Sequence, residues 1–330
     1  MEDTLLEVRD LQVEFSTKMG IVRVLDKVNL KVDPRQTVGI IGESGCGKSM
    51  MALSIMGLVP IPPGRIAGGE ILYRGTDLLT LGKDAILDIR GKRIAMIFQE
   101  PMTSLNPVFR IGAQLDEVIA LHDGEGKSKE EIKERSIHLL EMAGIANCEG
   151  VYNMFPHELS GGMRQRVMIA MALSCNPKLI IADEPTTALD VTIQAQILDL
   201  LRNLKNKINS SIMLITHDLG VIAEMADYVV VMYAGRVVEK GTAEEIFANP
   251  AHPYTIGLMA SKPVVGKKVD KLYSIPGKVP NPINMPDYCY FKDRCEMQVE
   301  KCSGEYPHMI QLSPTHMVSC YRYFDGKVGE

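Results

Sequence analysis

The sequence predicts an α/β protein with a mostly parallel core sheet, an antiparallel β subdomain, a helical subdomain and a small irregular C-terminal extension. Apolar segments of strand length alternate with segments of helical composition, and three of them are continuous, at residues 178–182, 211–216 and 228–233. Continuous apolar strands separated by helices are typical of a parallel sheet that helices cover on both faces. Glycine and proline become frequent after about residue 249, which predicts the irregular extension.

The first segments of the chain differ from this core. Residues 6–15 and 22–32 alternate apolar and polar side chains, which predicts two antiparallel strands with one face in water. Residues 68–75 have the pattern of a further hairpin strand. Residues 93–98 have that of a core strand, and it ends at Gln99. We therefore expect an antiparallel β subdomain before the core sheet is complete.

Helical periodicity replaces the strand pattern between about residues 100 and 175, and residues 129–143 are its clearest amphipathic stretch. We expect one domain over residues 1–250, with this helical subdomain inserted into it. The extension then occupies residues 251–330, where prolines break any long helix.

Composition and charge restrict the class of protein. The 330 residues are 46% hydrophobic and 23% charged, and a net charge of −5 gives no electrostatic reason to expect nucleic acid as a partner. No apolar run approaches the roughly 18 residues that a membrane span needs. The acidic N-terminus lacks the order of charges of a signal peptide, so we expect a cytoplasmic chain with reduced thiols.

Residues 42–49 read Gly-Glu-Ser-Gly-Cys-Gly-Lys-Ser and fit a known phosphate-binding pattern. Its glycines let backbone N–H groups converge on phosphate oxygens at the start of a helix. Lys48 is expected to neutralise the β and γ phosphates of ATP, and Ser49 to bind Mg²⁺. A chance glycine-rich turn is the simpler alternative, but a predicted strand precedes the segment and a predicted helix follows it. The other residues expected to contact the nucleotide are Gly42, Ser44, Gly45, Cys46, Gly47 and Met50.

A second pattern is the apolar strand at residues 179–182, which ends in two adjacent carboxylates. We expect Asp183 to bind Mg²⁺. Hydrolysis needs a water oriented in line with the γ-phosphate and an acceptor for its proton, and Glu184 is expected to be that general base. An acidic pair in a surface turn is the alternative, and the motifs around it disfavour that interpretation.

The segment Leu-Ser-Gly-Gly at residues 159–162 precedes a basic predicted helix and resembles the signature of ATP-binding-cassette (ABC) proteins. In that family Ser160, Gly161 and Gly162 present their N–H groups to an anion at a helix start. The alternative is a capped helix that binds nothing.

Further residues of the sequence resemble individual positions of the ABC pattern. Gln99 resembles the glutamine that contacts Mg²⁺ and senses the membrane partner, and Asp190 the aspartate of the D-loop. His217 resembles the switch histidine that contacts the γ-phosphate. Phe15 occupies the position of the aromatic ring that stacks on adenine, with a packed strand residue as the alternative. Met163 departs mildly from the family, which most often has glutamine there.

Four cysteines in the extension, Cys289, Cys295, Cys302 and Cys320, are too widely spaced for the paired motifs of common zinc sites. Four thiolates suit an iron–sulfur cluster, a structural Zn²⁺ remains an alternative, and scattered free cysteines are the simplest interpretation. His308 or His316 could replace one ligand.

Residues 99–107, 249–255 and 275–280 look like stretches of the dipeptide and oligopeptide importer ATPases. In that family the tail carries such a cysteine set, proposed to hold a [4Fe-4S] cluster. The resemblance covers essentially the whole chain and implies an ATPase that powers import of di- or oligopeptides. It implies a head-to-tail dimer with a second ABC ATPase subunit, two transmembrane permease subunits and, indirectly, an external peptide-binding protein. Its place would be peripheral, on the cytoplasmic face of the cell membrane.

Two alternatives to peptide import remain at this point. One is the ATPase of a related importer for nickel or another small solute, because this subunit never touches the cargo. The other is a soluble ABC protein that acts on DNA or ribosomes. Such proteins carry a second cassette or a coiled-coil insertion, and the sequence has neither.

Overall fold

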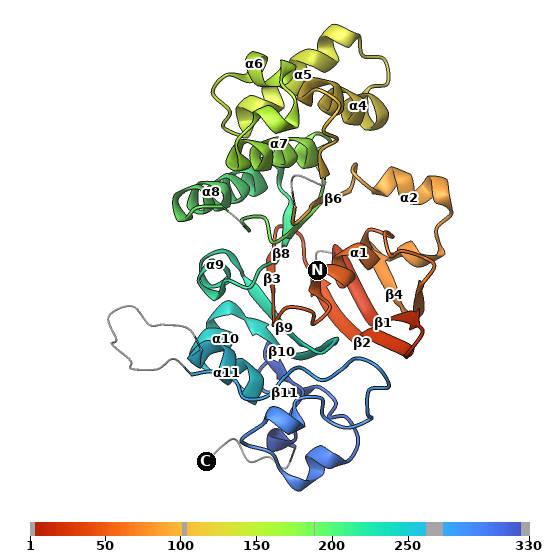
Figure 1. Ribbon diagram of the computed structural model, residues 1–330, viewed down its shortest axis with the longest axis vertical. Coiled ribbons are helices and arrows are strands. Elements are labelled where there is room, and N and C mark those ends of the chain that lie inside the picture. Colours follow the sequence, from red (N-terminus) through yellow and green to blue (C-terminus); the bar gives the residue numbers. More distant parts are fainter. Residues whose placement is uncertain (1–3, 101–103, 188, 262–272, 325–330) are drawn as a thin grey trace. The chain divides into compact units, whose positions relative to one another are not determined.

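The computed structural model describes residues 4–100, 104–187, 189–261 and 273–324 (Figure 1). The chain forms two compact units. One comprises Met1–Leu5, Asp33–Gln36 and Thr80–Ile215, and the other Leu6–Val32, Thr37–Leu79 and Thr216–Glu330.

The unit containing Thr80–Ile215 is built on three parallel strands. They are β6 (Ile94–Ile97), β7 (Leu179–Asp183) and β8 (Ser211–Ile215), in the order β6-β7-β8. Every residue of β7 and β8 is buried. Strands buried on both faces are continuous in apolar residues, which confirms the prediction of a parallel core.

The described residues of this unit also form α-helices. They are α2 (Lys83–Ile89), α4 (Ile111–Asp123), α5 (Lys129–Met142), α6 (Cys148–Asn153), α7 (Gly161–Leu173) and α8 (Val191–Ile208). Figure 1 shows α4, α5, α6 and α7 packed together as a helical group. The start of α5 is set by a capping box, in which Ser128 and Glu131 satisfy each other's backbone N–H groups. The predicted amphipathic helix at residues 129–143 is thereby confirmed.

The second unit contains an antiparallel sheet in the order β2-β1-β4-β5. Its strands are β1 (Leu6–Thr17), β2 (Gly20–Val32), β4 (Gly64–Tyr73) and β5 (Thr76–Asp77). The alternation of buried and exposed side chains along β1 agrees with the predicted wet face.

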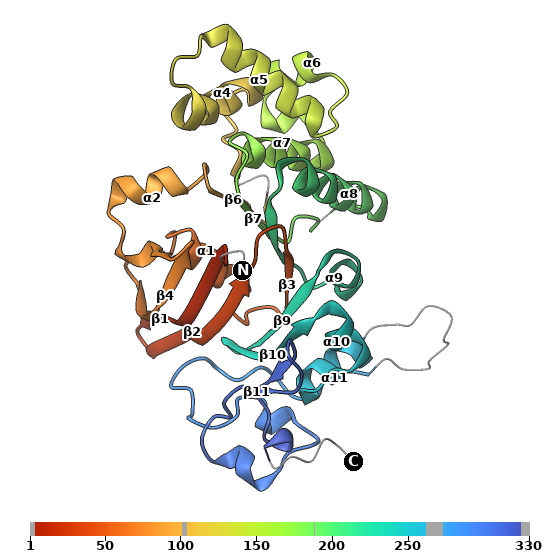
Figure 2. The same ribbon diagram turned by 180° about the vertical axis from the view of Figure 1, so that it is seen from behind.

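The same unit holds strands in the order β11-β12-β10-β9-β3. They are β3 (Thr37–Ile41), β9 (Tyr228–Tyr233), β10 (Arg236–Thr242), β11 (Ile310–Gln311) and β12 (Met317–Val318). Strand β3 runs parallel to β9, whereas β10, β12 and β11 pair antiparallel. The helices are α1 (Lys48–Ile55), α9 (Leu219–Met225), α10 (Ala243–Ala248) and α11 (Pro253–Ala260). Seen from behind, β11 lies close to β10 (Figure 2), so the end of the chain extends a sheet that earlier strands begin.

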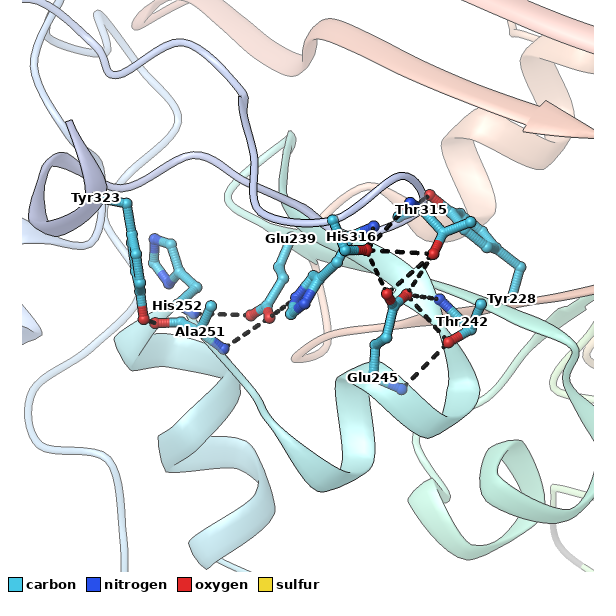
Figure 3. A network of polar contacts seen from close by, with 10 residues as sticks. Tyr228, Glu239, Thr242, Glu245, Ala251, His252, Thr315, His316 and Tyr323 are labelled. Atoms are coloured by element: carbon cyan, nitrogen blue, oxygen red, sulfur yellow. Dashed lines mark hydrogen bonds and ion pairs between the residues drawn. The ribbon is translucent and has the colours of Figure 1, made fainter. Parts of the chain in front are cut away.

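A buried polar network holds this end of the chain in place (Figure 3). The Glu239 carboxylate, which is 0% exposed, accepts hydrogen bonds from the N–H groups of Ala251 (2.7 Å) and His252 (2.8 Å). It also lies 2.7 Å from Nε2 of His316. Backbone pairing places β12 beside β10, and this network connects β10 to the residues that begin α11.

The neighbouring carboxylate, Glu245, completes the network. Burial by itself would raise the pKa of Glu245, but hydrogen bonds from Ser313, Thr242 and Thr315 lower it to about 2.

Within the described ranges, no helix is long and apolar enough to cross a membrane.

Candidate functional site

The phosphate-loop sequence forms the turn that its glycines allow. Strand β3 ends at Ile41 and α1 begins at Lys48, as predicted. Gly42 has a φ of 151°, and a Cβ atom there would lie 2.2 Å from the backbone oxygen of Met232. Gly47 has a φ of 100°, in a region that L-residues rarely adopt. Only glycine fits either position, so the loop geometry depends on both.

Side chains of the loop divide into buried and exposed sets. Nζ of Lys48 is buried and donates to the carbonyl oxygens of Gly42 (2.7 Å) and Glu43 (3.0 Å). Cys46 is also buried, and burial raises the pKa of its thiol. Ser44, Gly45 and Ser49 are exposed, and Met50 is half-buried. Of these, Ser49 lies in the first turn of α1, where N–H groups suit an anion, and Ser44 and Gly45 precede the helix in the loop.

A pocket of about 190 Å³ lies beside the loop. The pocket brings together Gly42, Ser44 and His217, three residues that sequence reasoning had singled out. It is also lined by Leu258 and Ser261, which no sequence pattern indicated as site residues. The C-terminal region thus contributes to the surroundings of the phosphate loop.

Phe15 lies on β1 opposite Val22 of β2 and Gly64 of β4, and its side chain is half-buried. A Cβ atom at Gly64 would lie 3.0 Å from the Phe15 ring. The ring therefore packs over the glycine, and stacking on adenine stays a prediction.

The other unit holds the acidic pair. Asp183 ends β7 and is 4% exposed, and Glu184 follows with a φ of 46°. Oε2 of Glu184 accepts hydrogen bonds from Nε2 of Gln99 (3.0 Å) and from the hydroxyl of Thr187 (2.8 Å). Gln99 and Glu184 are 85 residues apart, so the structure brings two predicted site residues together. Thr187 is a partner that sequence reasoning missed.

The predicted ABC signature begins a helix in this unit. Ser160 is the N-cap of α7, and its hydroxyl accepts a hydrogen bond from the N–H of Met163 at 3.3 Å. The carboxylate of Asp190 caps α8 in the same way, by accepting a hydrogen bond from the N–H of Ile193 at 2.9 Å. Gly162 lies so close to α8 that a Cβ atom would come within 2.9 Å of Ile193. The capping role is observed, and contact with a nucleotide stays a prediction.

The four cysteines of the extension are free thiols, and burial raises the pKa of Cys289 to about 12 and that of Cys320 to about 11. Cys302 is also buried, and Cys295 is half-buried. Among the residues that the structure describes, however, no three His, Cys, Asp or Glu side chains form a group able to hold a metal ion. The predicted metal site is therefore not confirmed.

The two histidines considered as replacement ligands have other contacts. His316 bonds to Glu239, and the ring of His308 packs on Phe324 with 4.4 Å between centroids. The structure gives no support to either histidine as a ligand.

Comparison with known proteins gives two matching families. The family described as ABC transporter matches residues 25–187, and the one described as the C-terminal region of oligopeptide/dipeptide transporters matches residues 238–302. The oligopeptide transport ATP-binding protein AppD of Bacillus subtilis is 49% identical, over 97% of this chain and 97% of its own. OppD of Salmonella typhimurium, with the same description, is 47% identical over 97% of this chain and 94% of its own.

Similar solved structures include the dimeric ATP-binding cassette MJ0796 in a post-hydrolysis state bound to ADP and Pi. Its TM-score is 0.65 at 29% identity, over 72% of this chain and 98% of that one. The cassette CbiO1 of Clostridium perfringens, part of the transporter complex CbiONQ, has a TM-score of 0.63 at 27% identity, over 75% and 92% of the two chains.

Proposed function

The chain belongs to the ABC transporter family, in the group of oligopeptide transport ATP-binding proteins, and from this premise we propose how it powers peptide import. It hydrolyses ATP as the ATPase subunit of a peptide importer. The observation that carries this conclusion is the sequence identity of 49% with AppD, over 97% of both chains. The strand, glycine loop and helix from Thr37 to Ile55 agree with it.

In the proposed mechanism the loop binds the phosphates through its N–H groups and Lys48. Glu184 accepts the proton of the attacking water, and the hydrogen bonds from Gln99 and Thr187 orient its carboxylate. His217 contacts the γ-phosphate. When bound, Mg²⁺ neutralises phosphate charge, and the oxygens of Ser49, Gln99 and Asp183 are of the kind it binds.

The proposed working unit is a head-to-tail pair of ATPase subunits. In each half, Ser160, Gly161 and Gly162 face the ATP that the partner's loop holds, and Asp190 caps α8, the helix that Gly162 lies against. N–H groups at the start of α7 suit the negative charge of the phosphates. Two transmembrane permease subunits and an external peptide-binding protein complete the importer, with this chain on the cytoplasmic face of the membrane.

Deletion of the gene in its native host tests the substrate. We expect uptake of a labelled oligopeptide to fall to background, because import has lost its energy source, while uptake of labelled nickel is unchanged. A plasmid copy should restore peptide uptake and a Lys48→Ala copy should not. Loss of nickel uptake with normal peptide uptake would instead favour the small-solute alternative.

We also propose that Cys289, Cys295, Cys302 and Cys320 hold a [4Fe-4S] cluster. The support is the donor set: four free, at least partly buried thiols within residues 289–320, in the number that such a cluster needs. A cluster bound there would tie four segments of the extension together. No step of ATP hydrolysis depends on it.

Anaerobic purification of the full chain tests the cluster. We expect about four iron and four sulfide per chain with visible absorption, because each thiolate ligates one iron of such a cluster. Replacing Cys302 with Ser should remove most of the iron, and the same change at Cys148, outside the set, should not. A colourless protein with one zinc per chain would exclude the cluster in favour of the Zn²⁺ alternative.

A further inference from the structure

Glu43, the second residue of the phosphate loop, is held by the C-terminal region. Its carboxylate oxygens accept hydrogen bonds from both terminal nitrogens of Arg294, at 2.7 and 3.0 Å. Its N–H donates to the hydroxyl oxygen of Tyr254 at 2.7 Å. Its carbonyl oxygen accepts from Nζ of Lys48 at 3.0 Å. Residues more than 200 positions later in the chain thus fix both the side chain and the backbone of Glu43.

The side chain of Arg294 is itself held in place by its neighbours. Its side chain is 5% exposed, and Nε donates to the carbonyl oxygen of Pro276 at 2.8 Å. The next residue, Gly277, has a φ of 73°, and a Cβ atom there would lie 3.2 Å from Cγ of Arg294. The guanidinium is thereby fixed in its plane and presents two N–H groups to one carboxylate. Bidentate pairs of this kind are strong and directional.

Tyr254 is equally constrained. It is 0% exposed, and its ring packs on Tyr233 and Phe291 with centroids 4.7 and 5.5 Å away. The N–H of Tyr254 donates to Nδ1 of the buried His252, which caps α11. The hydroxyl oxygen is therefore held in one position, where it accepts the hydrogen bond from the N–H of Glu43.

These contacts give a structural role to residues 249–255 and 275–280, which the proposed transport mechanism does not use. Residues 249–255 include Tyr254, which contacts Glu43. Residues 275–280 include Pro276 and Gly277, which contact Arg294. The extension has other attachments to the core, including Tyr290 to Asp26 at 2.7 Å and His316 to Glu239. The contacts at Glu43 are therefore not needed merely to keep the extension in place.

A phosphate loop binds ATP well when its N–H groups and lysine are already in position. We propose that Arg294 and Tyr254 are positioning residues for ATP: by fixing Glu43, they hold the phosphate loop and Lys48 in the geometry that binds the phosphates. The C-terminal region is on this view part of the ATP site. The inference rests on ATP binding at this loop and goes beyond the peptide-import function.

The test is the dissociation constant of Mg·ATP, measured by calorimetric titration of the full-length chain. Arg294→Gln is expected to raise it about tenfold and Tyr254→Phe about threefold, since each loses hydrogen bonds to Glu43. The matched control is Tyr228→Phe, which removes the hydroxyl bond from Tyr228 to the carbonyl oxygen of Thr315 (3.0 Å), another bond between core and extension. Tyr228 pairs with Val38, whereas the loop follows the other end of β3, so the constant should change less than twofold.

A double-mutant cycle separates positioning from a general structural effect. If Arg294 acts through Glu43, the variant Glu43→Gln/Arg294→Gln binds ATP about as weakly as Arg294→Gln alone. Additive losses would overturn the inference. If Arg294→Gln does not fold, the two tyrosine variants decide the question, and equal dissociation constants for Tyr254→Phe and Tyr228→Phe would also overturn the inference. Failure of the unmodified chain to bind ATP would instead refute the ATP site itself.

Discussion

Replacing Glu184 with Gln is expected to lower steady-state ATP hydrolysis by about 10²- to 10⁴-fold while ATP still binds. The change keeps the size of the side chain. It also keeps an oxygen that can accept a hydrogen bond from the Thr187 hydroxyl, which lies 2.8 Å from Oε2 of Glu184 in the unmodified chain. It removes the carboxylate that takes the proton from water. A backbone φ of 46° and a 2.8 Å bond from its N–H to the Ile215 carbonyl hold the residue at the end of β7.

Phosphate release and ATP affinity are both measured to check this expectation. The control is Glu158→Gln, the same change at a residue whose carboxylate accepts from the N–H of Phe155 instead. It should leave hydrolysis within about twofold, as most surface changes do. Normal hydrolysis in Glu184→Gln would show that another group is the base. Loss of ATP binding would show that Glu184 acts before the chemical step.

Local sequence patterns predicted the parts of this structure that depend on local chemistry. A strand buried on both faces must be apolar throughout, so β7 and β8 were visible in the sequence. A backbone with positive φ favours glycine, so the turn at Gly42 and Gly47 was visible too. The hydrogen bond between Gln99 and Glu184 was not itself predicted, but both residues follow predicted strands.

The contacts between distant polar side chains left no such pattern. Glu43 and Arg294 are 251 residues apart, and neither position differs in the sequence from an exposed charged residue. The same holds for Glu239 and His316, which are 77 residues apart. Pairing of this kind depends on how the chain folds back on itself, and no periodicity encodes it. The cysteine spacing likewise indicated a set of thiols without fixing what they hold.

The largest stability effect is expected at Glu239. Its carboxylate is 0% exposed and has three partners, the N–H groups of Ala251 and His252 and Nε2 of His316. Glu239→Ala leaves two N–H groups and a buried imidazole without their acceptor, and breaking a buried pair in this way costs about 3–5 kcal/mol. It acts on β10, where β12 pairs, and on the residues that begin α11.

Urea denaturation of the full chain measures this loss as the change in free energy of unfolding. Glu245→Gln is the comparison, because Glu245 is a nearby but partly exposed carboxylate that Thr242, Ser313 and Thr315 can still contact through the amide. Its loss should stay near 1 kcal/mol, in the range of ordinary hydrogen bonds. A loss below about 1 kcal/mol for Glu239→Ala would mean that water replaces the carboxylate. The end of the chain would then be held by β12 and its apolar contacts instead of by the buried charge.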